Sequence, residues 1–401
     1  MRTMDTDLTI INAVIFDGTG PDRFDGSLRI VDGRIVELGD GVKPGDQVLD
    51  ARGRTVIPGL IDAHFHAYAV SLHTDTIEVS PLSYLAIAAT GRLSAALRRG
   101  FTTVRDVAGG DAGLARAIEQ GLFASPRYYY TGAALSQTGG HGDPRSGDLE
   151  ERFLGGRMCV LVDGEDEVRR VVRERFRRGA HAIKIMTSGG VVSLTDPIRV
   201  PQYSAGEIRA AVDEATRRGS YVAAHAYSPE AIKHSVENGV RSIEHGNLLD
   251  QETAQFMVEH DAYLVPTLGA YDAIDRRGAL LNLAPVSQAK NREVLLAGQG
   301  SIGIARAAGV SIGFGSDLMG ELEDDQLCGL RLQIEADGVA NTIRSATSVN
   351  ASLIGRQDLG RIAVGAIGDV LILDGDPFAD PTVLWDEARP KRVVQGGTVA
   401  L

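Results

Sequence analysis

The sequence is short of cysteine, tryptophan and long hydrophobic runs. Its 401 residues include two cysteines, Cys159 and Cys328, and one tryptophan. Two cysteines cannot form a disulfide framework, which argues against a small disulfide-stabilised secreted protein and favours a reducing compartment. No apolar run is long enough to span a bilayer, and the first residues carry charges where a signal peptide has its apolar core. We therefore expect a soluble cytoplasmic protein.

Basic residues are also in deficit. Lys and Arg number 41 against 53 Asp and Glu, a formal charge of −12, and the basic residues form no runs. This balance argues against nucleic acids and anionic membranes as partners. The share of hydrophobic residues, 43%, and of charged residues, 23%, is that of a globular protein. The chain is too long for one ordinary compact domain unless it forms a barrel.

Both ends of the chain have the patterns of β-strands. Asp32-Gly33 is a strong hairpin signal near the N-terminus. The strand-like segments are residues 8–16, 27–31 and 34–38 at one end and 360–365, 368–374 and 393–399 at the other. Because these strands have no partners in the middle of the chain, we expect both ends to form one small discontinuous β-sandwich domain, residues 1–57 and 361–401.

Between the ends, strands alternate with amphipathic helices, which is typical of βα units and a parallel sheet. The predicted strands are residues 57–62, 102–106, 128–134, 182–186, 221–225, 242–245, 263–267 and 311–315. The predicted helices between them include residues 91–99, 166–178, 207–218 and 292–308. Eight parallel strands with intervening helices predict an α/β fold, a (β/α)8 TIM barrel over residues 58–360.

Two histidines stand at the end of the first predicted barrel strand. Side chains alternate between the two faces of a strand, so His64 and His66 point the same way and Phe65 points the other. Two neutral imidazoles on one face can share a metal ion. A His-x-His pair alone is weak support, because two polar residues in a loop would look the same.

Further ligand-type residues follow at the ends of later strands, where barrels carry their chemistry. They are Lys184, His225, His245 and Asp317. Alternation places Lys184 inside the barrel, where a lysine is costly unless it is paired or modified. Singly, each has an ordinary explanation: a snorkelling lysine, core histidines, a helix N-cap. Together with the histidine pair, they indicate a metal site.

In these residues and their order, the chain resembles the amidohydrolase superfamily of metal-dependent hydrolases. The resemblance implies that Lys184 is carboxylated on its ε-nitrogen and bridges two divalent metal ions. One ion would be held by His64, His66 and Asp317, and the other by His225 and His245. Imidazole ligands favour zinc, although other divalent metals also fit.

Finer motifs resemble the prolidase-like branch of that superfamily. They lie at residues 136–143, 187–193, 225–227 and 244–248. The branch hydrolyses Xaa-Pro or Xaa-Arg/Lys dipeptides and N-acyl amino acids, and ochratoxin-hydrolysing amidases belong near it. The resemblance implies that His141 binds the carbonyl oxygen and Tyr227 the substrate carboxylate. A surface position for His141 and a packing role for Tyr227 are the alternatives. Met319 departs from the pattern of many relatives and predicts a different pocket wall.

The predicted function is hydrolysis of an amide bond in dipeptides or N-acyl amino acids with a free carboxylate by a metal-bridging hydroxide, with Asp317 carrying the proton to the leaving amine. The sequence does not choose among proline, basic and aromatic leaving residues, and a toxin or aryl amide is an alternative substrate. A mononuclear deaminase or cyclic-amide hydrolase on the same barrel is a second alternative, and an inactive structural relative a third. By analogy with the family, we expect a homo-oligomer.

Overall fold

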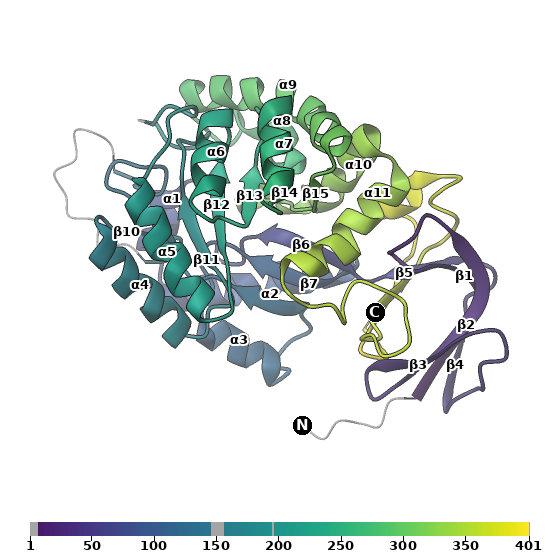
Figure 1. The fold of residues 1–401 in the computed structure, drawn as a ribbon. Coiled ribbons are helices and arrows are strands. Elements are labelled where there is room, and N and C mark those ends of the chain that lie inside the picture. The colour runs from purple at the N-terminus through teal and green to yellow at the C-terminus, as the bar shows by residue number, and fades with distance from the viewer. Residues whose placement is uncertain (1–6, 146–155, 195, 401) are drawn as a thin grey trace.

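A computed structural model describes residues 7–145, 156–194 and 196–400. A barrel of strands surrounded by helices makes up most of the molecule, and a sheet built from both ends of the chain lies beside it (Figure 1). In the part of the chain that the structure describes, no helix combines the length and the apolar character needed to cross a membrane.

The sheet beside the barrel joins the two ends of the chain, as predicted. Its order is β18-β17-β16-β5-β1-β2-β3, and β4 also pairs with β1. The central contact is between β5 and β16, which run antiparallel with Leu371 opposite Ile57. The strands are β1 (Asp7–Phe16), β2 (Arg23–Val31), β3 (Arg34–Gly39), β4 (Gln47–Asp50), β5 (Thr55–Pro58), β16 (Val370–Ile372), β17 (Arg392–Gln395) and β18 (Thr398–Val399).

One predicted strand of this sheet, residues 360–365, is wrong. Gly360 and Gly365 have φ angles of 66° and 90°, so the segment turns at both ends instead of extending. Its apolar side chains still pack against the sheet, since Ile362 is buried in the same hydrophobic cluster as Ile35.

The barrel strands pair in parallel as β6-β7-β8 and as β10-β9-β11-β12-β13-β14-β15. Backbone hydrogen bonds from Ala63 to Phe314 (2.9 Å) and from Asp317 to His64 (2.8 Å) join the last strand to the first. Gly315 permits this close approach, because a Cβ there would lie 2.4 Å from His64 Cβ. The strands are β6 (Leu60–Phe65), β7 (Phe101–Asp106), β8 (Arg127–Tyr130), β9 (Ala134–Ser136), β10 (Cys159–Leu161), β11 (Ile183–Met186), β12 (Val222–Ala226), β13 (Ser242–His245), β14 (Tyr263–Val265) and β15 (Ser311–Ile312).

Three details of the barrel differ from the sequence prediction. The first barrel strand begins after Gly59, because Ile57 and Pro58 belong to β5 of the terminal sheet. The predicted third strand is two short strands, β8 and β9, separated by a turn at Gly132, which has a φ of 71°. The short strand β10 was not predicted.

The helices lie outside the barrel strands (Figure 1). Local signals in the sequence fix several ends: Ser204 and Glu207 form a capping box at the start of α5, and Gly309 ends α9 in the left-handed conformation. The helices are α1 (Thr74–Val79), α2 (Leu82–Arg98), α3 (Ala112–Glu119), α4 (Glu165–Arg177), α5 (Ala205–Arg217), α6 (Pro229–Glu237), α7 (Gln251–Glu259), α8 (Leu268–Arg277), α9 (Pro285–Ala308), α10 (Gln326–Asp337), α11 (Val339–Arg344) and α12 (Asn350–Leu353).

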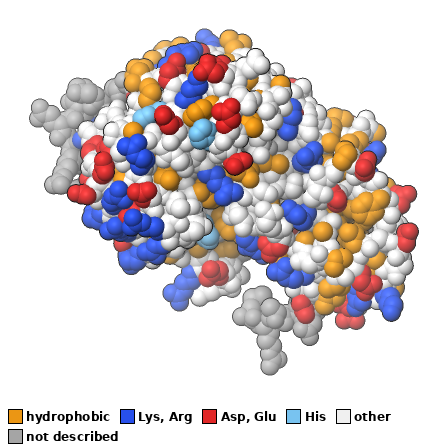
Figure 2. Space-filling model, viewed as in Figure 1, with side chains coloured by type: hydrophobic (Ala, Val, Ile, Leu, Met, Phe, Trp, Pro, Cys, Tyr) orange, Lys and Arg blue, Asp and Glu red, His pale blue; other side chains and the backbone are white. Residues whose placement is uncertain are grey.

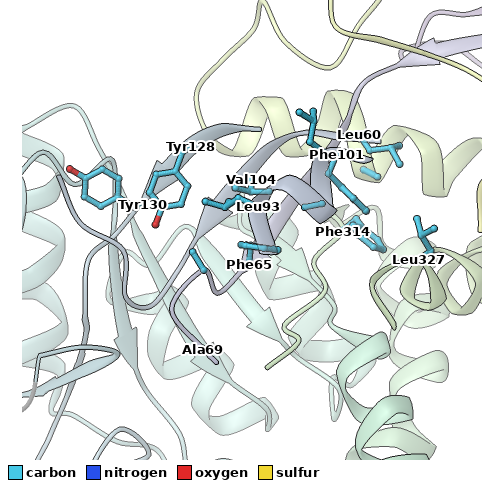
Figure 3. Close-up of a cluster of buried hydrophobic side chains, with 14 of the residues drawn as sticks. Leu60, Phe65, Ala69, Leu93, Phe101, Val104, Tyr128, Tyr130, Phe314 and Leu327 are labelled. Atoms are coloured by element: carbon cyan, nitrogen blue, oxygen red, sulfur yellow. The ribbon is translucent and has the colours of Figure 1, made fainter. Parts of the chain in front are cut away.

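Hydrophobic side chains fill the layer between the barrel strands and the helices. In the cluster of Figure 3, Phe101 of β7 stacks on Phe314 with ring centroids 5.7 Å apart, next to Leu93 of α2 and Leu327 of α10. On the face shown in Figure 2, basic and acidic side chains are interspersed over the barrel helices, and hydrophobic side chains gather over the terminal sheet. The apolar core therefore lies outside the strands and leaves the barrel interior to polar residues.

Candidate metal centre

All eight residues predicted for the site line one cavity at the C-terminal ends of the barrel strands. They are His64 in β6, His66 just after it, His141 after β9, Lys184 in β11, His225 in β12, Tyr227 just after β12, His245 in β13 and Asp317 after β15. The structure thus brings together side chains that the sequence spreads over most of the chain. Met319 also lines this cavity.

Asp317 lies among three histidines. Its Oδ1 is 3.0 Å from His66 Nε2 and 3.4 Å from His64 Nε2, and its Oδ2 is 3.7 Å from His245 Nδ1. One ligand atom each from His64, His245 and Asp317 falls within 4.8 Å of the others, which is the spacing of a group able to hold a metal ion. Burial raises the pKa of Asp317, but the imidazoles outweigh it and hold that pKa well below its usual value.

Apart from contacts with Asp317, three histidines of the cluster each have one ring nitrogen engaged by the protein. His64 Nδ1 is 2.7 Å from a Glu244 oxygen, His66 Nδ1 is 3.4 Å from the carbonyl of Ala108, and His225 Nε2 is 3.1 Å from the carbonyl of Gly189. Bonds of this kind fix the ring orientation and leave the second nitrogen to coordinate a metal.

His245 is oriented by two hydroxyl groups. Its Nδ1 lies 2.8 Å from both the Thr267 hydroxyl and the Tyr271 hydroxyl. Burial holds the pKa of His245 and that of His225 well below the usual value, so both rings are neutral at pH 7. Neutral imidazole is the form that binds metals.

Lys184 is buried among these residues, with 2% of its surface exposed. Burial lowers the pKa of its ammonium group to about 8, against the opposing charges of Glu244 and Asp317. Within the described ranges, no residue accepts a hydrogen bond from its Nζ. A buried amine without an acceptor is costly, so the position suits a lysine that is modified or bound to metal.

Glu244 and Arg105 form a buried ion pair behind His64 that the sequence reasoning missed. One Glu244 oxygen accepts from Arg105 Nη2 at 2.7 Å and from the Ser242 hydroxyl at 2.6 Å, while the other contacts His64. Burial raises the pKa of Glu244, but Arg105 and His64 outweigh it, and the pKa is lowered. Strict alternation along 242–245 would have placed Glu244 inside the barrel.

His141 stacks on His225, with ring centroids 4.2 Å apart. Its Nδ1 lies 2.9 Å from the Ser193 hydroxyl, which in turn bonds to Asp196. Lys290 holds this loop by donating to three backbone carbonyls, among them those of Ser193 (2.9 Å) and Asp196 (2.7 Å). The loop positions the imidazole at the cavity wall, so His141 is not a surface residue.

Gly190 allows the loop to pass against His141. A Cβ at position 190 would lie 2.0 Å from His141 Cε1, far inside any normal contact. The glycine-rich sequence after β11 is therefore explained by the close packing of the two loops.

Tyr227 stacks on the His245 ring, with centroids 5.2 Å apart. Its hydroxyl lies 2.9 Å from that of Tyr271. Tyr271, in α8, connects Tyr227 to His245 and also lines the cavity, yet no motif in the sequence singled it out. Its role depends on how α8 folds over the barrel rim, which periodicity does not reveal.

A parallel barrel with a terminal sheet, and with histidines and an aspartate gathered at the C-terminal ends of its strands, is the architecture of amidohydrolases. The chain belongs to the amidohydrolase family, whose model matches residues 55–400. It is therefore a hydrolase of a family that acts on small molecules, and the resemblance inferred from the sequence is confirmed.

Relatives place the chain near two kinds of hydrolase. It is 30% identical to ochratoxinase from Aspergillus niger over 98% of this chain and 87% of that protein. Among solved structures, a prolidase complexed with N-methylphosphonate-L-proline is 45% identical, with a TM-score of 0.95 over 98% of this chain and 99% of that one. A Xaa-Pro dipeptidase with bound methionine is 29% identical, with a TM-score of 0.89 over 98% and 99%. These neighbours confirm the predicted branch.

Proposed function

We propose that the protein is a metal-dependent hydrolase that cleaves the amide bond of dipeptides or N-acyl amino acids with a free carboxylate, and that Xaa-Pro dipeptides are its first candidates. The observation that carries this proposal is the cavity in which Asp317 lies among His64, His66 and His245, close to the buried Lys184. The similarity to a prolidase and a Xaa-Pro dipeptidase supports the substrate class.

We propose that this donor set holds two divalent ions, for which zinc is the first choice. Imidazoles and a carboxylate are ligands that zinc accepts, and a carbamate on Lys184 would add a bridging anion. The residues that would hold the ions are His64, His66 and Asp317 for one, His225 and His245 for the other, and carboxylated Lys184 for both. When bound, the ions lower the pKa of a water molecule toward neutrality and polarise the scissile carbonyl.

Asp317 would carry the proton. Because its pKa lies well below the usual value, its carboxylate is ionised at neutral pH and can accept a proton from the attacking water. The same group would then deliver that proton to the leaving nitrogen. Its place at the centre of the histidine cluster supports this role.

His141 and Tyr227 would bind the substrate. His141 Nδ1 donates to the Ser193 hydroxyl, which donates to Asp196, so Nε2 is the nitrogen left for the carbonyl oxygen, to which it would donate in the imidazolium form as negative charge develops there. The Tyr227 hydroxyl, oriented by Tyr271, would donate to the substrate carboxylate.

The test of the mechanism is Asp317→Asn, assayed with Zn²⁺ and bicarbonate on a panel of dipeptides and N-acyl amino acids. Loss of general acid–base catalysis should reduce kcat by roughly 100- to 10,000-fold. Asp213→Asn, a surface aspartate on α5, is the matched control and should keep wild-type activity. Full activity of Asp317→Asn would refute the mechanism, and a wild type that cleaves no member of the panel would refute the substrate class.

Metal content separates the proposal from a mononuclear deaminase or cyclic-amide hydrolase. We expect two ions per chain in the wild type and fewer, with loss of activity, in Lys184→Ala. One ion per chain and an active Lys184→Ala variant would favour the mononuclear alternative.

A further inference from the structure

Beyond the predicted metal ligands and His141, the cavity has one charged side chain in the described part of its lining, Glu78. Much of the remaining wall is apolar. Its apolar members include Leu72, Met158, Val192, Ile274, Met319 and Leu322. A single carboxylate in such surroundings favours a ligand that brings a positive charge to it, because a cation there gains a charge-assisted hydrogen bond.

Glu78 is fixed in place by the backbone that leads into β10. Its carboxylate, in the last turn of α1, accepts hydrogen bonds from the backbone N–H groups of Arg157 (3.0 Å), Met158 (2.8 Å) and Cys159 (3.3 Å). A carboxylate has about four acceptor positions. Three are used by the backbone, so a further donor can be accepted from the cavity.

Glu78 lines the same cavity as His141 and the predicted metal ligands. The Cys159 side chain, next to it, is buried, and it would be 2.8 Å from a Cβ on Gly142, the residue after His141. Cys159 and Met158 line the cavity together with Glu78. Tyr227 follows β12 and Tyr271 lies in α8, on other sides of the barrel, so the two ends of the cavity differ in chemistry. A substrate whose carboxylate meets Tyr227 would place its acyl half toward Glu78.

We propose that Glu78 binds an ammonium group in the acyl half of the substrate, so that the enzyme prefers dipeptides with a cationic amine to uncharged N-acyl amino acids. This inference rests on the proposed amide hydrolysis. The ammonium can come from the free N-terminus or from a basic side chain of the N-terminal residue, and the experiment separates the two.

The test compares three substrates with the zinc- and bicarbonate-loaded enzyme: Leu-Pro, N-acetyl-Leu-Pro and N-acetyl-Lys-Pro. If the N-terminal ammonium meets Glu78, kcat/KM for Leu-Pro exceeds that for N-acetyl-Leu-Pro by roughly 10- to 100-fold, the value of a hydrogen bond to a charged group. If a side-chain ammonium meets Glu78 instead, kcat/KM for N-acetyl-Lys-Pro exceeds that for N-acetyl-Leu-Pro by a similar factor.

Glu78→Gln keeps a carbonyl oxygen for the backbone N–H groups but removes the charge. It should raise KM for the preferred cationic substrate by about tenfold or more and leave N-acetyl-Leu-Pro unchanged. Glu335→Gln, on the surface of α10, is the matched control and should behave as wild type.

Three outcomes overturn the inference. They are equal turnover of all three substrates by the wild type, an equal loss on charged and uncharged substrates in Glu78→Gln, or no change in that variant. The wild-type comparison stands even if the variant fails to fold. If the wild type cleaves none of the three, the proposed function itself fails, which is distinguishable from cleavage without preference.

Discussion

Breaking the buried pair of Arg105 and Glu244 behind the metal site should strongly destabilise the protein. The guanidinium and carboxylate approach to 2.7 Å, and both side chains are almost fully buried. With an effective dielectric constant of about 20, charges about 4 Å apart attract by about 4 kcal/mol. Removing one partner also leaves the other charge buried alone, which typically costs about 3 to 5 kcal/mol.

We therefore expect Glu244→Gln and Arg105→Met each to lower the free energy of unfolding by about 3 to 5 kcal/mol. The double variant removes both charges, so its loss should be smaller than the sum of the two single losses by about 2 kcal/mol. The assay is denaturant unfolding of the four metal-free proteins at pH 7, because bound metal would add its own stabilisation. Single losses below about 1 kcal/mol, or strictly additive losses, would refute this reasoning.

Two further predictions concern the same surroundings. The pKa of Glu244 is lower in the folded than in the unfolded protein, so its contribution to stability is present above the unfolded value near 4.5 and is lost as the pH falls below that value. The difference in unfolding free energy between wild type and Glu244→Gln should therefore narrow from pH 7 to pH 4. A widening difference would contradict this prediction. Ser193→Ala should lower kcat about tenfold with unchanged metal content, because His141 loses its hydrogen-bond partner at Nδ1. Ser193→Thr keeps a hydroxyl and should restore kcat. A wild-type kcat in the alanine variant would show that the hydroxyl does not position the ring.

Much of the fold could be predicted because the sequence carries strong local signals for it. Hydrophobic strands that end in ligand residues predict the barrel, and basic pairs before glycine predict the ends of α4 and α5. The errors fall where a segment is short or where glycine dominates. β10 has three residues, and the segment 360–365 looks extended until the positive φ angles of Gly360 and Gly365 turn it.

The eight candidate site residues could be located because parallel strands of a barrel end at one rim. The residues that orient these side chains could not be located from the sequence, because each orienting contact joins two distant elements. Glu244 meets Arg105 of β7, and His245 meets Tyr271 of α8. Alternation can tell that a side chain points inward, but not which of several inward residues it will meet.

The pairing of β5 with β16 also bears on how the protein is made. β5 leads directly into β6, which carries His64, and one of its edges pairs with a strand that lies near the other end of the chain. A growing chain that leaves the ribosome N-terminus first has β5 early and its partner β16 late. Folding on the ribosome therefore cannot complete this joint at the start of the first barrel strand, and that edge of β5 stays open to other strands until β16 has emerged.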